Sequence, residues 1–396
     1  MANISSSNGL EKRPKLRFPG FDEPWQSTLL SSVFTKNTKK NTDGQITNVI
    51  CNSAKQGLIP QREYFDKDIA NSDNTSGYYI IEENDFVYNP RKSADAPYGP
   101  ISRYKYAEAG IVSPLYLCFR AKKEINPSSF EWYFRSSAWH RYVYMSGDSG
   151  ARHDRVSIKD DTFFAMPINL PSAHEQEHIA SFLERIDQRI EKQRALVESL
   201  KKYKRGLVKA LISGTVAFAC SENKRWETVR LAEIFTISAG GDIDRQNSSP
   251  TYSTSYPYPV YANALTNNGL YGYANYFKVE GDSITVSGRG EVGHAIARHC
   301  KYVPIVRLLS LVPKYEDDVD FFAYMINATS IYIESTGVPQ LTSPQLGAVK
   351  VFRPPILEQK RISSLLLKID AKIENEERLT FYLEKIRSSM LQQLFI

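Results

Sequence analysis

Cysteine is scarce in this sequence: only four of 396 residues are Cys, and no two of them form a Cys-x-x-Cys pair. That spacing argues against a disulfide framework and a zinc knuckle, and it favours reduced thiols in a cytoplasm. Long hydrophobic runs are missing too, because no apolar stretch approaches the roughly 18 residues of a membrane span. The first twenty residues are polar and offer no apolar segment of a signal peptide. We therefore expect a soluble, cytoplasmic chain with no membrane partner.

A strong excess of charge of one sign is also absent. Lys and Arg number 50 against 44 Asp and Glu, which gives a formal net charge of +6. This weakly basic balance suits a polyanionic partner without requiring one. Tyrosine, by contrast, is abundant, with 24 residues against four Trp. Rings with one polar tip suit wet contact surfaces and also fill the faces of sheets.

What the sequence does contain is an internal repeat. When the chain is shifted by 183 residues, two stretches of about forty residues align without a gap. The identical pairs include Pro171/Pro354, Glu175/Glu358, Gln176/Gln359, Ile179/Ile362, Leu183/Leu366, Ile186/Ile369, Asp187/Asp370, Ile190/Ile373, Leu196/Leu379, Leu200/Leu383 and Leu211/Leu394. So many identities in one register indicate a duplication, and self-similarity of this kind governs the architecture.

Both copies of the repeat predict long helices. In each, apolar residues recur mostly in steps of three and four, which is the heptad spacing of a narrow seam. The predicted seam residues are Ile179, Leu183, Ile186, Ile190, Leu200, Leu207, Leu211, Ile362, Leu366, Ile369, Ile373, Leu383, Met390 and Leu394. Polar residues interrupt both seams at equivalent places, Gln193 and Glu376, then Lys204 and Arg387. Neither helix can bury its seam alone, so we expect an antiparallel intramolecular coiled coil.

Two regions that resemble each other little stand in front of the helices. Each opens with a similar phrase, at Trp25 in the first and at Trp226 in the second. Short β-type runs alternate there with turn signals, as in compact, mostly β domains. We divide the chain into a flexible tail (1–14), a first β domain (15–170), a central helix (171–214), a linker (215–224), a second β domain (225–353) and a C-terminal helix (354–396). The predicted fold class is α+β with pseudo-two-fold internal symmetry.

This layout resembles the specificity (S, HsdS) subunit of type I restriction–modification enzymes, and the resemblance covers nearly the whole chain. The helix openings at 171–177 and 354–360 look like the family's Pro-x-x-x-Glu-Gln signature. The start at 17–21, followed by Trp25, looks like its common N-terminal phrase. Segments similar to recurrent parts of the family's target-recognition domains lie at 86–89, 110–116, 287–293 and 304–307.

The resemblance implies a non-catalytic subunit that reads DNA sequence. Each of two target-recognition domains would read one half of a bipartite, asymmetric target in double-stranded DNA, and the two long conserved helices would set the spacer. The resemblance also implies docking of two methyltransferase (M) subunits, which use S-adenosylmethionine, and of restriction (R) subunits, where present, which use ATP and Mg. The chain itself is expected to bind no cofactor or metal and to have no catalytic residue.

Residues that contact DNA are expected among polar and basic side chains on loops held by rigid strands. The candidates in the first domain are Tyr88, Asn89, Arg91, Lys92, Arg103, Tyr104, Lys105, Arg152, His153 and Arg155. Those in the second domain are Asn263, Asn267, Asn268, Ser287, Arg289 and Arg307. For each residue, an ordinary solvated side chain is the alternative interpretation.

Two matches to enzyme motifs favour structural interpretations. His174 to His178 match the H-E-x-x-H helix of zinc peptidases, but the second repeat has Leu357 and Arg361 in place of the histidines, and no third ligand is evident. Residues 288–293 match G-x-G-x-x-G, yet the chain after them looks extended, whereas a dinucleotide site needs a helix there. This glycine loop either lets an arginine approach DNA or is a purely structural turn.

A second hypothesis belongs to a different class. The chain could be an interaction scaffold whose coiled coil recruits protein partners and whose DNA binding is incidental. Phosphate-anchored sequence reading weakens steeply with salt and distinguishes one site from scrambled DNA, whereas a scaffold is indifferent to sequence.

Overall fold

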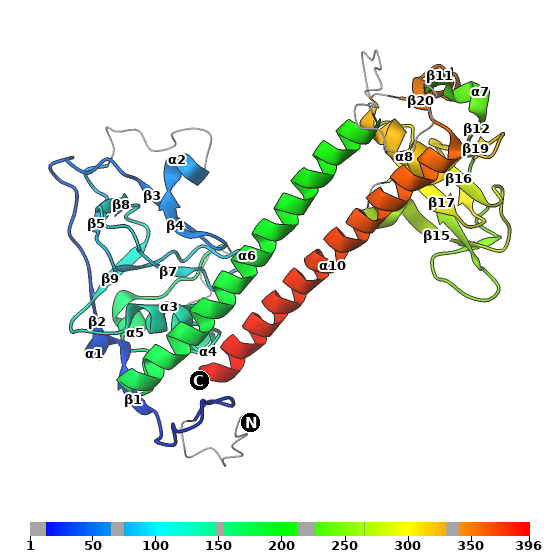
Figure 1. Ribbon diagram of the computed structural model, residues 1–396. Helices are drawn as coiled ribbons and strands as arrows, with labels where there is room; N and C mark the ends of the chain where they lie inside the picture. Colours follow the sequence, from blue (N-terminus) through cyan, green and yellow to red (C-terminus); the bar gives the residue numbers. More distant parts are fainter. Residues whose placement is uncertain (1–12, 65–74, 148–153, 213–225, 265, 330–339) are drawn as a thin grey trace. The chain divides into compact units, whose positions relative to one another are not determined.

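The structure, a computed structural model, describes residues 13–64, 75–147, 154–212, 226–264, 266–329 and 340–396. The chain divides into two compact units, one of residues 1–193 with 379–396 and the other of residues 194–378. Each unit contains one β-rich domain and part of two long helices (Figure 1). Within the described residues, none of the helices combines the length and the hydrophobicity needed to cross a membrane. The predicted linker, and the predicted tail up to residue 12, lie outside the described residues.

The β-rich domain of the first unit is built on an antiparallel sheet with the strand order β2-β9-β6-β7. These strands are β2 (Phe34–Lys36), β9 (Leu117–Ala121), β6 (Phe86–Tyr88) and β7 (Ile101–Arg103). The strand pairs are β1 (Gln26–Leu29) with β10 (Pro167–Leu170), β3 (Ile50–Ser53) with β4 (Gly57–Pro60), and β5 (Tyr79–Ile81) with β8 (Gly110–Val112). Its short helices are α1 (Leu30–Val33), α2 (Gln61–Tyr64), α3 (Pro127–Arg135), α4 (His140–Ser146) and α5 (Asp160–Phe164).

The β-rich domain of the second unit has a sheet with the order β12-β19-β16-β17. These strands are β12 (Phe235–Ala239), β19 (Leu308–Pro313), β16 (Asp282–Ser287) and β17 (Ala295–His299). Another sheet has the order β13 (Ser248–Ser249), β15 (Leu270–Ala274), β14 (Tyr258–Tyr261) and β18 (Val303–Pro304), and β11 (Glu227–Arg230) pairs with β20 (Lys350–Arg353). The short helices are α7 (Leu231–Ile234), the 3-10 turn η2 (Thr266–Gly269), α8 (Val319–Ala328) and α9 (Ser343–Gly347).

The two domains share one framework and differ around it. Strands β2, β9, β6 and β7 follow one another as β12, β19, β16 and β17 do, so β6 and β16 hold equivalent places. In both domains a strand pair leads through a one-turn helix into this sheet. The remaining strands form separate pairs in the first domain and one sheet in the second. Among the described residues, the two domains therefore share this sheet with its strand pair and one-turn helix, and they differ in how their remaining strands are arranged.

Local sequence determines where the helices that cover these sheets begin. Helix α3 follows Asn126, whose side chain accepts a hydrogen bond from the backbone N–H of Ser129. Helix α8 follows Asp318, which accepts in the same way from the backbone N–H of Phe321. Both helices bury aromatic residues against the sheet, as Phe34 and Phe130 show at 5.0 Å between ring centroids. Burial of each such ring stabilises the fold by about 1.5–3 kcal/mol.

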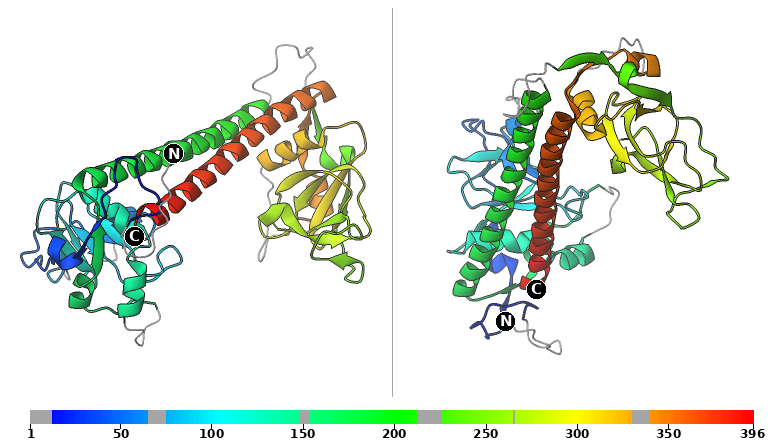
Figure 2. Two further views of the ribbon diagram at one scale, coloured as in Figure 1. Left: turned by 90° about the horizontal axis from the view of Figure 1, so that it is seen from below. Right: turned by 45° about the vertical axis from the view of Figure 1, so that its right-hand side comes forward.

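The long helices α6 (Ala173–Ile212) and α10 (Ile356–Leu394) lie side by side (Figures 1 and 2). In the second unit, Lys201 of α6 pairs with Glu377 of α10 at 2.8 Å, and Lys204 pairs with Asp370. Partner numbers on α10 fall as those on α6 rise, so the helices are antiparallel, as predicted. In the first unit the same helices meet where Arg387 donates to Asp187.

The predicted seam residues turn away from solvent: each of them is buried or half-buried. Ile179, Leu183 and Leu394 belong to the core of the first unit, and Ile362 and Leu366 to that of the second. The polar interruptions Gln193 and Glu376 are 4% and 8% exposed, so they are enclosed by the helices as well. Each β-rich domain is thus built directly onto one part of the helix pair.

Candidate nucleic-acid interface

A hollow of about 900 Å³ opens in the first β-rich domain, beside the β3–β4 hairpin and the loop that follows β6. Four of the predicted DNA-contacting residues line it, namely Asn89, Arg91, Lys92 and Arg155. Its polar lining also includes Asn52, Lys55, Gln56 and Tyr116, which sequence reasoning did not select. The missed signal was the hairpin turn itself, because Gly57 closes it with φ +72° and exposes the two residues before it.

Arg91 presents a positive charge at this hollow. Its side chain is exposed and forms neither a hydrogen bond nor an ion pair with the residues that the structure describes. Its backbone forms a β-bridge with Arg155, and Lys92 donates to the carbonyl of Asp154 at 2.8 Å, so the loop is fixed to the segment before α5. The Nε of Arg155 is buried without a hydrogen bond in the described structure, and the carboxylate of Asp154 lies 3.9 Å from it.

The second domain exposes an arginine at the equivalent place. The loop that follows β16 carries Arg289, whose side chain is exposed and makes no hydrogen bond or ion pair in the described part of the chain. Its backbone forms a β-bridge with Gln340, which lies shortly before α9 as Arg155 lies shortly before α5. The two loops are therefore built alike. Each loop follows the equivalent strand of its sheet, β6 or β16, and forms a β-bridge with a segment that lies shortly before a short helix.

The G-x-G-x-x-G stretch at 288–293 is a tight loop between antiparallel strands, as its extended surroundings predicted. A Cβ on Gly288 would lie 2.4 Å from the carbonyl oxygen of Arg307, so only glycine fits there. Gly290 and Gly293 have φ of +78° and +86°, which glycine adopts without strain. The strand β17 follows, so the loop lacks the helix N-terminus that cradles a dinucleotide.

Three predicted contact residues belong to the interior, and for them the prediction is wrong. Tyr88 is 1% exposed, its hydroxyl donates to the carbonyl of Tyr98 at 2.8 Å, and burial raises the pKa of its phenol. Tyr104 is fully buried and donates to the carbonyl of Glu108 at 2.8 Å. Ser287 is 6% exposed, and its hydroxyl bonds backbone groups of its own loop. Each side chain packs the sheet that carries the loops.

Three further candidates have partners within the protein. Glu131 of α3 lies 3.7 Å from a guanidinium nitrogen of Arg103 and 2.7 Å from the ammonium of Lys105. Arg307 has φ +68°, and its Nη1 donates to Gln340 at 2.7 Å. These cations contribute charge near the loops and each has an acceptor within the protein, although the Nε of Arg103 is buried without one in the described structure.

The asparagine candidates of the second domain shape its loops. Asn267 and Asn268 have φ of 51° and 50°, the left-handed region that Asn tolerates better than most residues. Asn263 directs its side chain at the backbone of the arginine loop. Arg152 and His153, the remaining candidates, lie outside the described residues.

The H-E-x-x-H sequence opens helix α6 and serves as a structural anchor. Glu175 is 1% exposed and accepts from the guanidinium of Arg17 at 2.8 Å and from the indole of Trp25 at 3.1 Å. His174 and His178 are exposed, with ring centroids 4.7 Å apart. Among the described residues, no group of three or more metal-binding side chains gathers.

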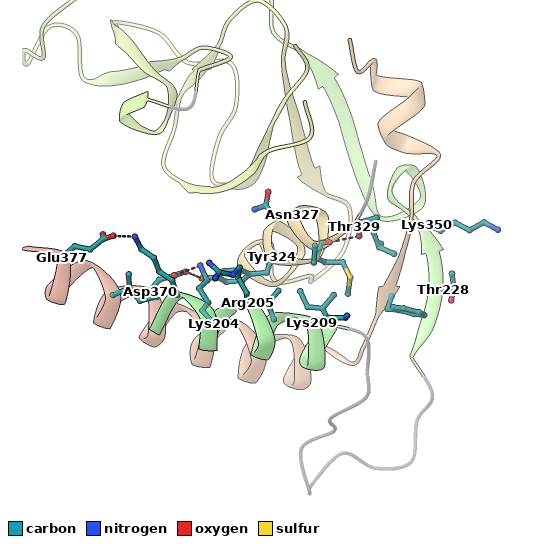
Figure 3. A pocket seen from close by; sticks show the side chains of 18 residues that line it. Lys204, Arg205, Lys209, Thr228, Tyr324, Asn327, Thr329, Lys350, Asp370 and Glu377 are labelled. Atoms are coloured by element: carbon teal, nitrogen blue, oxygen red, sulfur yellow. Dashed lines mark hydrogen bonds and ion pairs between the residues drawn. The ribbon is translucent and has the colours of Figure 1, made fainter. Parts of the chain in front are cut away.

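A second hollow, of about 1090 Å³, lies in the second unit where helix α8 meets the long helices (Figure 3). The charged residues of its lining are mostly basic, with Arg205 and Lys209 among them (Figure 3). Asp370 accepts from the hydroxyl of Tyr324 and pairs with Lys204, so this carboxylate joins both helices to the β-rich domain. Burial, together with the carboxylate, raises the pKa of Tyr324. The hollow contains none of the predicted DNA contacts.

The duplicated framework and its paired arginine loops define a recognition protein with two reading domains built on two long helices. A family model described as the type I restriction modification DNA specificity domain matches residues 23–201 and again 223–385. The chain therefore belongs to this family and carries two copies of its domain.

Individual relatives agree with this assignment. The chain is 26% identical over 246 residues to a putative type I specificity subunit of Mycoplasma pneumoniae, with 62% of this chain and 64% of that protein covered. It is 27% identical over 260 residues to the putative type I restriction enzyme MjaX specificity subunit of Methanocaldococcus jannaschii, with 61% of each covered. These alignments span just under two thirds of the relatives.

Solved structures share the fold. One chain, from a structure described as the basis of complex assembly and conformational transition of the type I R-M system, superposes with a TM-score of 0.63 at 17% identity, over 94% of this chain and 97% of that one. The S subunit of a type I restriction–modification system from M. genitalium gives 0.57 at 16% identity, over 97% and 99%. Two mixed α and β domains with packed long helices are thus the architecture of these neighbours.

Proposed function

We propose that this chain is the non-catalytic, sequence-reading subunit of a type I restriction–modification enzyme. One observation carries the proposal: equivalent loops after β6 and β16 present Arg91 and Arg289, whose side chains are exposed and have no hydrogen-bond or ion-pair partner among the described residues. Arginine is the residue that most often contacts guanine edges in the major groove, and it also binds phosphates. Two such loops on one duplicated framework suit a target with two parts.

The surroundings of the two loops support an asymmetric target. In the first domain the β3–β4 hairpin stands beside Arg91 and offers Lys55 and Gln56. In the second, the loop between β14 and β15 stands beside Arg289. Because these neighbours differ in chemistry, the two half-sites are proposed to differ in sequence.

The long helices are proposed to set the spacer between the half-sites. Inserting four residues just after Pro171 adds about one helical turn, roughly 6 Å. Since DNA rises about 3.4 Å per base pair, the spacer is expected to lengthen by one or two base pairs while both half-sites stay the same. A changed half-site with an unchanged spacer contradicts the proposal that the helices set the length of the spacer.

The helices also carry matching apolar surfaces that suit two copies of one partner. Leu196 and Tyr203 on α6 are 42% and 61% exposed, and their repeat equivalents on α10, Leu379 and Ile386, are 38% and 47% exposed. Exposed apolar side chains in a row favour protein docking. We assign these pairs to two methyltransferase (M) subunits, which would supply S-adenosylmethionine chemistry, while any restriction (R) subunits would use ATP and Mg.

The test compares Arg91→Ala and Arg289→Ala in the full chain assembled with its M subunits. Each variant should lower affinity for the cognate site about tenfold or more and relax base preference in one half-site only. Mapping of methyladenine positions and binding titrations against half-site variants measure this. Lys123→Ala, which removes an exposed cation after β9, is the control and should change neither. An assembled complex that binds all sequences alike favours the scaffold hypothesis instead.

A further inference from the structure

Two asparagines stand beside the arginine loops in a way that suggests a role other than reading bases. Building on the proposed function, we propose that Asn89 and Asn263 are positioning residues: each couples the arginine loop of its domain to a second loop, so that discrimination between sequences depends on it more than affinity does. Both were candidates for direct contact with DNA. Their amide groups point instead into the protein.

In the second domain, Asn263 clamps the arginine loop from the loop between β14 and β15. Its Oδ1 accepts from the backbone N–H of Gly288 at 2.6 Å and from that of Arg289 at 3.2 Å. Its Nδ2 donates to the carbonyl of Arg289. Both ends of the amide are thus engaged by the residues that carry the arginine side chain, and little capacity is left for a base edge.

The loop that holds Asn263 is itself anchored to the sheet by a buried arginine. Arg298 is 6% exposed, and its guanidinium lies over the ring of Tyr261 with 3.7 Å to the centroid. Its Nε donates to the hydroxyl of Thr285 at 2.9 Å, and its Nη2 donates to the carbonyl of Asn268 at 2.6 Å. A continuous set of contacts therefore runs from strands β16 and β17 through this loop to Arg289.

In the first domain, different residues connect the arginine loop to a second loop. The Oδ1 of Asn89 accepts from the backbone N–H of Arg91 at 3.1 Å, and its Nδ2 donates to the carbonyl of Asn52 at 3.2 Å. Asn52 belongs to the β3–β4 hairpin, is 5% exposed, and donates to the carbonyl of Val87 at 2.8 Å. The hydroxyl of Ser102 donates to its Oδ1 at 2.7 Å. The hairpin and the arginine loop are locked into one surface.

The shared arrangement has a physical consequence for specificity. An arginine on a loose loop still finds phosphates, because that attraction needs only charge and little geometry. A bidentate contact to one base needs the guanidinium held in one place, and pre-organisation lowers the ordering cost of that contact. Loss of the asparagine side chain should therefore weaken discrimination between base sequences more than it weakens overall affinity for DNA.

The experiment measures discrimination half by half with Asn89→Ala and Asn263→Ala, in the full chain assembled with M subunits. Each variant should reduce discrimination against single-base changes about tenfold in the half-site of its own domain and leave the other half-site unchanged. Non-specific affinity and its salt dependence should stay within about twofold. Asn263→Asp keeps the two acceptor bonds but places a carboxylate oxygen against the carbonyl of Arg289, so it should reduce discrimination in its own half-site as Asn263→Ala does.

Two comparisons keep the inference falsifiable. Asn275→Ala removes an exposed asparagine outside both loops, which bonds only Asn247 within the described chain, and it should leave discrimination intact. If the alanine variants lose specific and non-specific binding together, or lower discrimination in both half-sites with a lower melting temperature, the clamps are merely structural and the inference is overturned. If Arg91→Ala and Arg289→Ala alter discrimination while the asparagine variants do not, this inference alone fails. If neither set has an effect, the proposed function fails.

Discussion

The start of each long helix is anchored by the same bond in the two halves of the molecule, but the surroundings of that bond differ. Trp25 donates to Glu175 and Trp226 donates to Glu358, both at 3.1 Å. In the first unit Arg17 completes the site with two further bonds to the carboxylate, at 2.8 and 2.9 Å. In the second unit the Oε1 of the glutamate is buried without a partner among the described residues. The Trp–Glu bond is therefore common to both repeats, whereas among the described residues a cation pairs with the glutamate only in the first unit.

The junction between the helices and each β-rich domain shows the same contrast. The repeat-equivalent aspartates Asp187 and Asp370 each join both long helices to a covering helix of the domain. Asp187 does so with two guanidiniums, those of Arg135 and Arg387. Asp370 does so with the ammonium of Lys204 and the phenol of Tyr324. The duplication thus preserves where a carboxylate stands, and each half supplies its own donors, so the two halves should respond differently to the same substitution.

The largest difference is expected at the helix starts. Glu175→Gln leaves Arg17 buried, at 10% exposure, without its counter-charge, and breaking such a pair destabilises by about 3 kcal/mol. Glu358→Gln keeps an acceptor for Trp226 and removes a carboxylate that has no cation in the described structure, so the change should stay below about 1 kcal/mol. Hydrogen exchange, read separately over residues 173–183 and 356–366, measures each effect.

The double replacement Arg17→Met with Glu175→Gln is the control for this comparison. It removes both charges, so it should recover most of the stability lost in Glu175→Gln. Equal losses in the two single glutamine variants would show that the buried ion pair adds nothing to the Trp–Glu bond.

Substitution of Asp187 is expected to cause a smaller loss of stability, and the size of this loss depends on pH. Burial raises the pKa of this carboxyl, but the guanidiniums of Arg135 and Arg387 outweigh it, so the pKa lies below its usual 3.8. A carboxyl with a lowered pKa stabilises the fold at pH above 3.8, and this contribution is lost as the pH falls through the lowered value. Asp187→Asn should cost about 2 kcal/mol at neutral pH and remove this part of the acid dependence. Urea titrations between pH 2.5 and 7 test it, and an unchanged acid limb in the variant would contradict it.

The sequence predicted the helices and their pairing well because those signals are local and periodic. A seam with steps of three and four can be read along the chain, and the gapless repeat places its equivalents. The interior was harder to predict. Tyr88 was misassigned because β6 is buried on both faces, so no alternation of polar and apolar residues marks it. The hydrogen bonds from Asn263 to the arginine loop could not be predicted from the sequence, because the bonded residues lie 25 and 26 residues away along the chain.

The smallest expected difference concerns strands β7 and β17, which hold equivalent places beside α3 and α8. Arg103 at the end of β7 faces Glu131 with a permanent charge. His299 at the end of β17 lies between Asp282 at 2.9 Å and Asp320 at 3.1 Å. Burial lowers the pKa of this imidazole, but the two carboxylates outweigh it, so the pKa lies above 6.5. A group with a raised pKa stabilises the fold fully below pH 6.5, and that stability is lost as the pH rises through the higher value.

The second unit should therefore become slightly less stable between pH 6 and pH 8, whereas the first should not. Because the ring is half exposed, the contribution should remain below about 1 kcal/mol. His299→Gln should flatten this dependence, while Arg103→Gln, the matched change in the first unit, should lower stability by a similar amount at every pH in that range. Hydrogen exchange of residues 319–328 against residues 127–135 across the pH range separates the two. A decline that persists in His299→Gln would assign it to another group and would remove the contrast between a titrating and a permanent charge at these equivalent positions.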